Sequence, residues 1–204
     1  MISVVYRESY RVIFYLAVPV FACAALLSPL VSRVWIGRYE TLFVEFASML
    51  AAGWLVNVLA NPAYVADLGT GALKWPSIGC LVAATLNAAL GFAAGMRFGG
   101  AGVVAATAIS QSVGYMVMVA AYHLENRVPF GELLPRESWT VFGASVIGVA
   151  CLLPVFCSAP MRSHFALVVA QAALALLLVA IAAMMWRHPM RRQLFLWLRT
   201  QAPA

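Results

Sequence analysis

Residues 75–124 read WPSIGCLVAATLNAALGFAAGMRFGGAGVVAATAISQSVGYMVMVAAYHL, and this stretch decides the fold class. Its single charged side chain, Arg97, divides it into two uncharged windows, 75–96 and 98–124. A helix rises about 1.5 Å per residue, so each window is long enough to cross a hydrocarbon core of about 30 Å. The pattern predicts two membrane-spanning helices, joined by a tight turn at Phe98, Gly99 and Gly100.

The rest of the chain repeats this pattern. Of its 204 residues 64% are hydrophobic and 10% are charged, whereas an average soluble domain is about 45–50% apolar and about 25% charged. The further uncharged windows of spanning length are 12–32, 46–66, 138–161 and 163–186. We therefore expect an all-α integral membrane protein, a bundle of six transmembrane helices.

The basic residues predict the orientation of this bundle. With a cytoplasmic N-terminus, the inner segments carry most of the 13 basic side chains, which is the positive-inside bias. Both termini are then cytoplasmic, and the basic tail after the last window anchors at anionic lipid. The net charge of +6 needs no nucleic acid to explain it. The inner set is Arg7, Arg11, Lys74, Arg127, Arg136, Arg187, Arg191, Arg192 and Arg199, and the outer set is Arg33, Arg38, Arg97 and Arg162.

Small and polar side chains recur every four residues in the windows 46–66, 75–96 and 98–124. Small residues let membrane helices approach closely, and amides can hydrogen-bond across such a contact. Amides on these faces can instead line a hydrated cavity, so packing and cavity remain alternatives for each Asn. The residues assigned to helix packing are Gly79, Ala83, Gly91, Gly95, Gly102, Ala106, Ser110 and Gly114, and the amide-bearing residues are Asn57, Asn61, Asn87 and Gln111.

The sequence contains no arrangement expected of an enzyme. It has no G-x-S-x-G or H-E-x-x-H motif and no carboxylate pair at helical spacing inside a window. Gly100-x-Gly102-x-x-Ala105 fits a dinucleotide fingerprint, but an apolar segment of helix length precedes it instead of a short strand. We expect no catalytic residue, no metal site and no cofactor. The cysteines, interpreted as buried free thiols, are Cys23, Cys80, Cys151 and Cys157.

Polar residues at the helix ends carry weaker indications. His123, His164 and His188 are expected to lie at the membrane interface. Lys74 follows Asp67 across a glycine-containing turn, where the two can form a salt bridge or an ordinary pair of loop charges.

The segment 126–137 predicts a solvated cytoplasmic loop, because it is charged and contains two prolines. It separates a four-helix section, 1–125, from residues 138–204, which hold two further helices and the basic tail. These last helices have few polar positions and are expected to face lipid.

Residues 61–119 resemble the C-terminal part of polysaccharide flippases of the multidrug/oligosaccharidyl-lipid/polysaccharide exporter superfamily. The likeness extends over about 7–125 and is carried by a proline-containing helix end with a glycine turn, a helix with a central Asn, and an F-G-x-x-G turn opening an Ala/Thr-rich helix. VWIG at 34–37 fits the same pattern. The residues concerned are Pro62, Gly69, Gly71, Asn87, Phe98, Gly99, Gly102 and Thr107.

The resemblance implies an inner-membrane transporter that turns lipid-linked oligosaccharide or polysaccharide precursors to the outer leaflet by alternating access between two lobes. Such flippases have about twelve or more helices, so this chain resembles one lobe, and we expect a second helical lobe or partner chain. The alternative is a structural membrane subunit, or a fragment, that binds partner helices without transport. The residues expected to line a substrate cavity are Asn57, Asn61, Tyr64, Lys74, Asn87 and Gln111.

Overall fold

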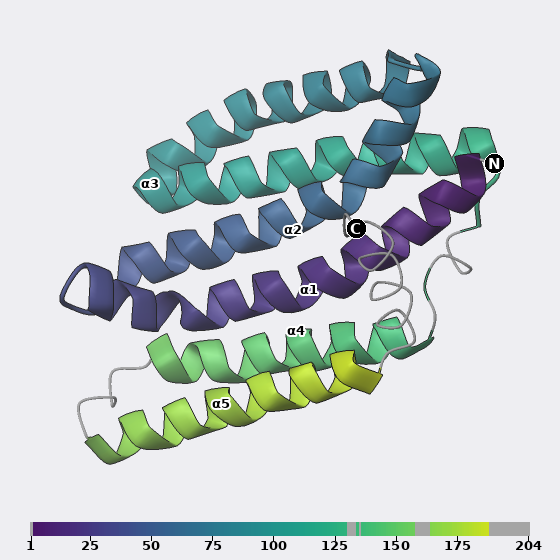
Figure 1. Ribbon diagram of the computed structural model, residues 1–204. Helices are drawn as coiled ribbons and strands as arrows, with labels where there is room; N and C mark the ends of the chain where they lie inside the picture. The colour runs from purple at the N-terminus through teal and green to yellow at the C-terminus, as the bar shows by residue number, and fades with distance from the viewer. Residues whose placement is uncertain (1, 130–133, 135, 158–163, 188–204) are drawn as a thin grey trace, which may run out of the picture.

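The computed structural model describes residues 2–129, 134, 136–157 and 164–187, which form helices and short connections and contain no strand. The basic tail, 188–204, and residues 130–133 and 135 of the predicted loop 126–137 lie outside the described residues. Figure 1 shows the order and arrangement of the helices. They are α1 (Ile2–Trp35), α2 (Thr41–Thr70), α3 (Lys74–Asn126), α4 (Arg136–Cys157) and α5 (His164–Arg187).

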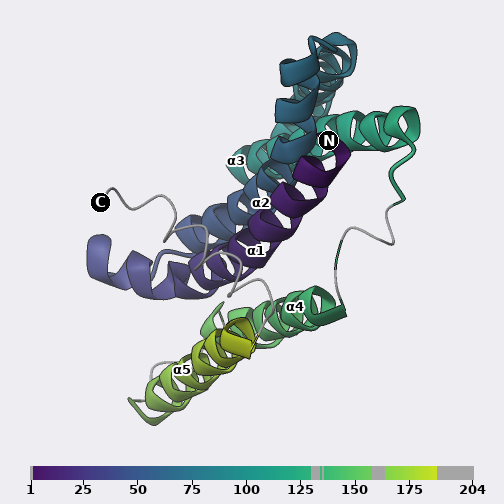
Figure 2. The same cartoon turned by 45° about the vertical axis from the view of Figure 1, so that its right-hand side comes forward.

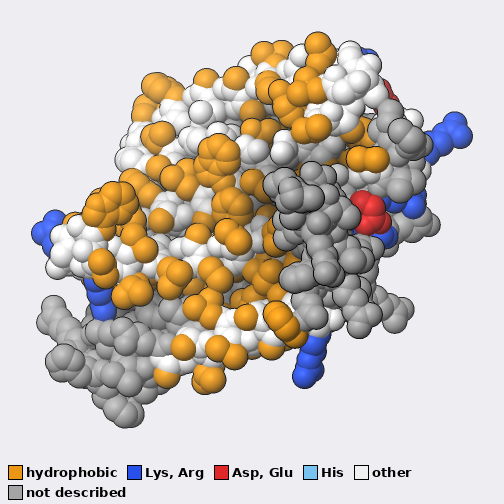
Figure 3. Space-filling view, in the orientation of Figure 1, with side chains coloured by type: hydrophobic (Ala, Val, Ile, Leu, Met, Phe, Trp, Pro, Cys, Tyr) orange, Lys and Arg blue, Asp and Glu red, His pale blue; other side chains and the backbone are white. Residues whose placement is uncertain are grey.

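The expectation of an all-helical fold is confirmed for the described residues, and that of six transmembrane helices is met in part. Three of the helices, α1, α2 and α3, are long and apolar enough to cross a membrane. In α4 and α5 the apolar stretches within the described side chains are shorter, Ser138–Leu152 and Ala175–Arg187. In Figure 3 the charged side chains lie toward the two ends of the molecule, with hydrophobic side chains between them. This distribution matches a bilayer, which excludes charge from its centre.

α1 and α2 run antiparallel and are joined by a short connection at 36–40 (Figure 1). The buried hydroxyl of Ser32 holds the connection, because it donates to the Arg38 carbonyl at 3.1 Å and accepts from the Glu40 N–H at 2.9 Å. Gly37 has φ 79°, a left-handed conformation that glycine adopts at little cost. These contacts reverse the chain over five residues.

α2 contains Pro62 and ends at Gly71. Proline removes one backbone hydrogen bond and tends to bend a helix, and Figure 1 shows α2 turning away from α1 over its last turns. Gly71 has φ 75°, and the Ala72 N–H donates to the Asp67 carbonyl at 2.9 Å. The glycine therefore closes the helix and directs the chain into α3.

α3 spans 53 residues but is interrupted at Gly99, where φ is 62° and ψ is −141°. The predicted turn at 98–100 is confirmed here, since the backbone leaves helical geometry at its central residue. Two arms, 74–98 and 100–126, run antiparallel beside each other (Figures 1 and 2). The windows 75–96 and 98–124 thus belong to one element that folds back on itself.

Residues without side chains bring the two arms into close contact. A Cβ placed on Gly79 would lie 2.7 Å from the Gly114 carbonyl oxygen, and one on Gly114 would lie 2.7 Å from the Ala83 Cβ. Nearer the turn, a Cβ on Gly102 would collide with the Ala94 carbonyl. These contacts are the close helix approach that small residues allow in membranes.

Most of the predicted packing residues lie on these contacts or are buried. Gly95 faces Val103 across the arms, and Ala106 and Ser110 are buried. Gly91 is different, because the nearest group to a Cβ there is the Asn87 side chain at 3.8 Å, in its own arm. α2 joins the second arm in the same way, with Gly53 packed on the backbone of Ala108.

α4 packs on α1 and on α5, so this pair lies to one side of the other helices (Figure 2). Phe14 of α1 meets Trp139 and Phe142 of α4, with ring centroids 6.4 and 5.9 Å apart. Further along α1, buried Leu26 contacts a group of aliphatic side chains on α4 and α5. Apolar contacts therefore attach α4 and α5 to α1 at two positions along α1, near Phe14 and near Leu26.

Candidate functional site

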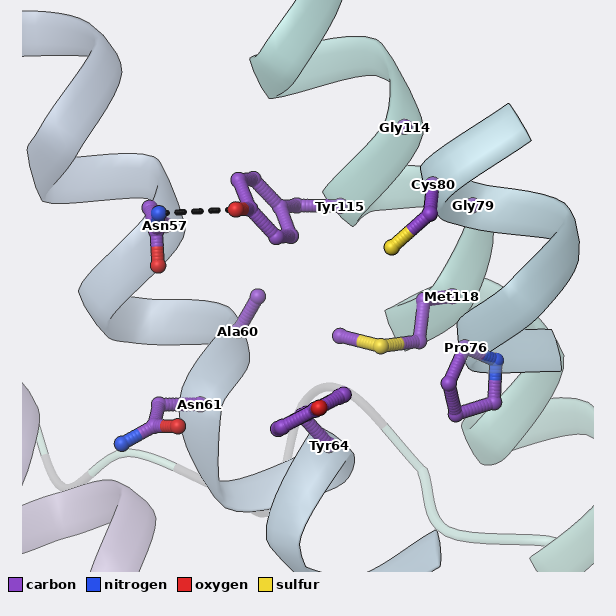
Figure 4. A pocket seen from close by; sticks show the side chains of 10 residues that line it. All are labelled: Asn57, Ala60, Asn61, Tyr64, Pro76, Gly79, Cys80, Gly114, Tyr115 and Met118. Carbon is purple, nitrogen blue, oxygen red and sulfur yellow. Dashed lines mark hydrogen bonds between the residues drawn. The ribbon is translucent and has the colours of Figure 1, made fainter. Parts of the chain in front are cut away.

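A cavity of about 280 Å³ lies between α2 and the two arms of α3 (Figure 4). α2 supplies one wall with side chains one turn apart, and the arms of α3 supply the other. The lining residues are Asn57, Ala60, Asn61, Tyr64, Pro76, Gly79, Cys80, Gly114, Tyr115 and Met118.

A hydrogen bond crosses the cavity from α2 to α3. The Asn57 side-chain amide donates to the Tyr115 hydroxyl at 2.8 Å, as the dashed line in Figure 4 shows. Among the described residues no further hydrogen bond is formed by the Asn57 carbonyl oxygen or by the Tyr115 hydroxyl hydrogen. One acceptor and one donor therefore remain for a ligand or for water.

Asn61 and Tyr64 continue the polar face of α2. They follow Asn57 by four and seven residues, the spacing that keeps side chains on one side of a helix. Both side chains are exposed. Asn61 also lines a second hollow of about 370 Å³, formed by the first turns of α1 and the last turns of α2.

The wall made by α3 depends on the glycine contact between its arms. Gly79 and Gly114 bring the arms together at the back of the cavity, and Cys80 and Tyr115, the next residues along the chain, point toward its interior (Figure 4). No charged side chain lines the cavity. Its amide and phenol groups can exchange hydrogen bonds with an uncharged polar ligand such as a sugar ring.

The structure brings together three of the six predicted cavity residues, namely Asn57, Asn61 and Tyr64. Lys74, Asn87 and Gln111 do not line this cavity. Tyr115, whose side chain reaches Asn57 across the helix interface, was not predicted from the sequence. Its position directly after Gly114 was the available signal, because the neighbour of a packing glycine borders the same interface.

Asn87 is instead a packing residue. The Thr107 hydroxyl lies 3.0 Å from its side-chain oxygen and 2.9 Å from the Val103 carbonyl, so it shares one hydrogen between two acceptors. This contact joins the two arms of α3. Gln111 is half-buried outside the cavity.

Lys74 does not pair with Asp67. Its ammonium lies 5.0 Å from the centre of the Trp75 ring, and within the described residues no ion pair joins it to an acid. Asp67 is 5% exposed, and its Oδ2 atom has no hydrogen-bond partner there. Of the two alternatives for these described residues, the salt bridge is not formed.

His123 lies in the last turn of α3, the helix end expected from the sequence, and its side chain is buried against protein. Its Nδ1 lies 2.8 Å from the Val128 carbonyl oxygen and its Nε2 lies 2.7 Å from the Tyr6 hydroxyl. A carbonyl only accepts, so Nδ1 carries the hydrogen, and Nε2 of the neutral ring accepts from Tyr6. The first turns of α1 are thereby fastened to the end of α3, and the rings of Tyr6 and Tyr122 pack with centroids 4.5 Å apart at a tilt of 40°.

Within the described ranges, no cluster of three or more His, Cys, Asp or Glu side chains can hold a metal ion. Comparison of the chain with protein-family models, with curated proteins and with solved structures found no match. The polar cavity between α2 and α3 is therefore the feature from which a function must be argued.

Proposed function

We propose that this chain is one lobe of a transporter that flips lipid-linked oligosaccharide or polysaccharide precursors across the bacterial inner membrane by alternating access. The observation that carries the proposal is the cavity lined by Asn57, Asn61, Tyr64 and Tyr115 inside an otherwise apolar helical body. Polar groups in membrane helices are costly and mark substrate pathways. The sequence resemblance points to the same class of transporter.

The chemistry of the cavity suits the glycan portion of such a substrate. Sugar hydroxyls both donate and accept, which matches the free acceptor of Asn57 and the free donor of Tyr115. Ligand pockets usually measure about 300–1,000 Å³, so a cavity of about 280 Å³ accommodates a small part of an oligosaccharide. The remainder lies toward a second lobe.

The diphosphate of the substrate needs cations that this cavity lacks. Lys74 lies over Trp75, outside the cavity. We infer that a partner lobe, from another chain or another part of a longer one, supplies these charges. The proposal thus includes a helical partner.

We interpret Gly99 as the point where α3 divides into two membrane spans, because its two arms are antiparallel and each is about 25 residues long. Counted this way the chain crosses the membrane six times, with its N- and C-termini in the cytoplasm. The Tyr6–His123 contact and the turn at Gly71 then lie on the cytoplasmic side.

A non-transporting subunit that binds partner helices is the second candidate. This candidate is favoured because both amides form hydrogen bonds between helical segments, Asn57 with Tyr115 and Asn87 with Thr107. On this view the cavity is a by-product of close glycine packing.

Two matched substitutions test the proposed transport. Asn57→Ala removes a cavity amide, and Asn87→Ala removes the same group from the arm contact outside the cavity. Vesicles of the native membrane carrying the full-length variants are loaded with a fluorescent diphosphate-linked oligosaccharide lipid. A membrane-impermeant quencher then reports its transfer between leaflets.

We expect Asn57→Ala to slow transfer by about two- to tenfold, because one hydrogen bond contributes about 0.5–1.5 kcal/mol, and Asn87→Ala to leave transfer near the wild-type rate. Equal rates for both variants and the wild type would refute a role of the cavity in transport. Loss of a co-purifying helical partner in both variants, with no transfer in the wild type, would favour the subunit.

A further inference from the structure

An apolar groove runs between α2 and α4, with α1 as its floor. Its volume is about 470 Å³. Both α2 and α4 pack against α1, and α4 also packs against α5. Its wall is made of Val18, Phe21, Ala22, Ala25, Ser48, Met49, Ala51, Ala52, Leu55, Phe142, Ser145, Val146, Val149 and Ala150.

The wall of the groove consists almost entirely of apolar side chains. Neither hydroxyl in the wall offers a free exposed donor, since Ser48 donates to the Val44 carbonyl at 2.7 Å and the Ser145 oxygen is buried, without a hydrogen-bond partner among the described residues. An apolar hollow of this kind does not hold water. An unfilled hollow is unfavourable, because its lining loses dispersion contacts. The occupant is therefore itself apolar.

Along α1 the groove is somewhat shorter than one lipid tail and much shorter than a membrane-spanning helix. Along α1 it extends from Val18 to Ala25, about 10 Å at 1.5 Å per residue. A lipid tail covers one leaflet, about 15 Å, whereas a transmembrane helix needs about 30 Å of contact. A partner helix laid here would extend well beyond both ends of the groove.

The side chains at the two ends confirm that the groove is short. Toward the start of α1 it is bounded by Phe14 and Trp139, which pack with Phe142. Toward the end of α1 it is bounded by buried Leu26, which contacts Val149 and Leu152. Bounded at both ends, the groove admits a flexible chain that enters sideways from the bilayer.

We propose that this groove binds one acyl chain of a bilayer phospholipid, which fills the gap between α2 and α4 and fixes the α4–α5 pair against α1. The lipid belongs to the leaflet at the α1–α2 connection, because the groove lies in the half of α2 that begins at Thr41. This site is separate from the polar cavity and does not depend on transport.

Lipid retention tests the site in the full chain. The protein is purified in a mild detergent, exchanged into fresh detergent, and its bound lipids are extracted and quantified by mass spectrometry. Ala52→Leu and Ala150→Leu place bulk in the groove at exposed positions, and Ala88→Leu makes the same change on the exposed surface of α3.

We expect about one phospholipid per chain in the wild type and in Ala88→Leu, and at least a fivefold loss in Ala52→Leu and Ala150→Leu. Equal retention in all four proteins overturns the proposal. It is also overturned if the retained molecule is an isoprenoid carrier lipid, or if cross-linking shows a second copy of the chain in the groove.

Photolabelling of the unaltered protein keeps the test independent of how the variants fold. Membranes containing a phospholipid with a diazirine in its acyl chain are irradiated, and labelled peptides are mapped. Labelling concentrated at 48–55 and 142–150 supports the site. Labelling spread evenly over exposed apolar residues such as Phe92 and Met96 of α3 contradicts it.

Discussion

Substitution of Gly114 by alanine tests the contact on which the cavity wall depends. The added Cβ would lie 2.7 Å from the Ala83 Cβ and 3.2 Å from the Ala83 backbone nitrogen, and it would collide with the Gly79 carbonyl. Two of these three groups are backbone and cannot rotate away, so the arms of α3 must separate. Overpacking of this kind costs about 1–3 kcal/mol.

The assay is thermal unfolding of the purified chain in detergent, followed by circular dichroism. For a chain of this size, about 1 kcal/mol corresponds to about 2–4 °C, so Gly114→Ala should lower Tm by about 2–12 °C. Gly91→Ala is the matched control, because the nearest group to its Cβ lies 3.8 Å away. Alanine is the better helix former, so the control should unfold at the same temperature or slightly higher. Equal Tm values for Gly114→Ala and the wild type would show that the arms are not packed at this point.

Three further substitutions have expected outcomes in the same assay. Gly99→Ala should cost about 1–3 kcal/mol, because φ 62° with ψ −141° is not accessible to alanine without strain; an unchanged Tm would mean that the turn lies elsewhere. Tyr6→Phe should cost about 1 kcal/mol by removing the hydroxyl that donates to His123, and a neutral effect would place His123 outside that contact. Asp67→Asn should raise Tm, because it replaces a buried carboxylate whose Oδ2 has no partner among the described residues with an uncharged amide; a lower Tm would reveal a partner for the charge.

The course of the helices was predictable because it depends on local features. Charge-free windows mark where a chain can enter the bilayer, and Gly99 and Gly71 adopt the positive φ angles at which two helices end. That Gly79 and Gly114 lie on packing faces was predictable from their four-residue spacing with other small side chains, whereas their contact with each other is seen only in the structure. Sequence patterns of this kind predict which face of a helix carries small side chains.

The same patterns could not predict which Asn side chain lines a cavity and which one packs between helices. Asn57 and Asn87 both lie four residues from small or polar neighbours, yet Asn57 reaches Tyr115 in a cavity while Asn87 meets Thr107 between the arms. The difference depends on how α2 and the two arms are rotated against each other, which no single helix encodes.

The burial of His123 depends on contacts between distant parts of the chain. Its partner Tyr6 lies 117 residues away in sequence, and the two meet only because α1 runs antiparallel to the second arm of α3. A histidine at a helix end looks interfacial from its own neighbours alone. For Lys74 and Asp67 the sequence left a salt bridge and an ordinary pair of loop charges open, and in the structure the Lys74 ammonium lies over the ring of the adjacent Trp75.

The central claim, that the space between α2 and α3 is a water-filled cavity, is tested most directly by the reactivity of Cys80. Its side chain is exposed and lines the cavity, whereas Cys151 is exposed on α4 outside it. Each lies six residues from an end of its helix, Lys74 or Cys157, so the two thiols have similar depth in the membrane.

The measurement compares two single-cysteine forms of the full chain, one retaining Cys80 and one retaining Cys151, each treated with a membrane-impermeant maleimide on both sides of the membrane. Thiols react as thiolates, which require water. The account predicts rapid labelling of Cys80, slowed by a diphosphate-linked oligosaccharide lipid, and little labelling of Cys151. If Cys80 is as unreactive as Cys151, the polar faces of α2 and α3 meet protein or lipid and the cavity is not a pathway for a glycan.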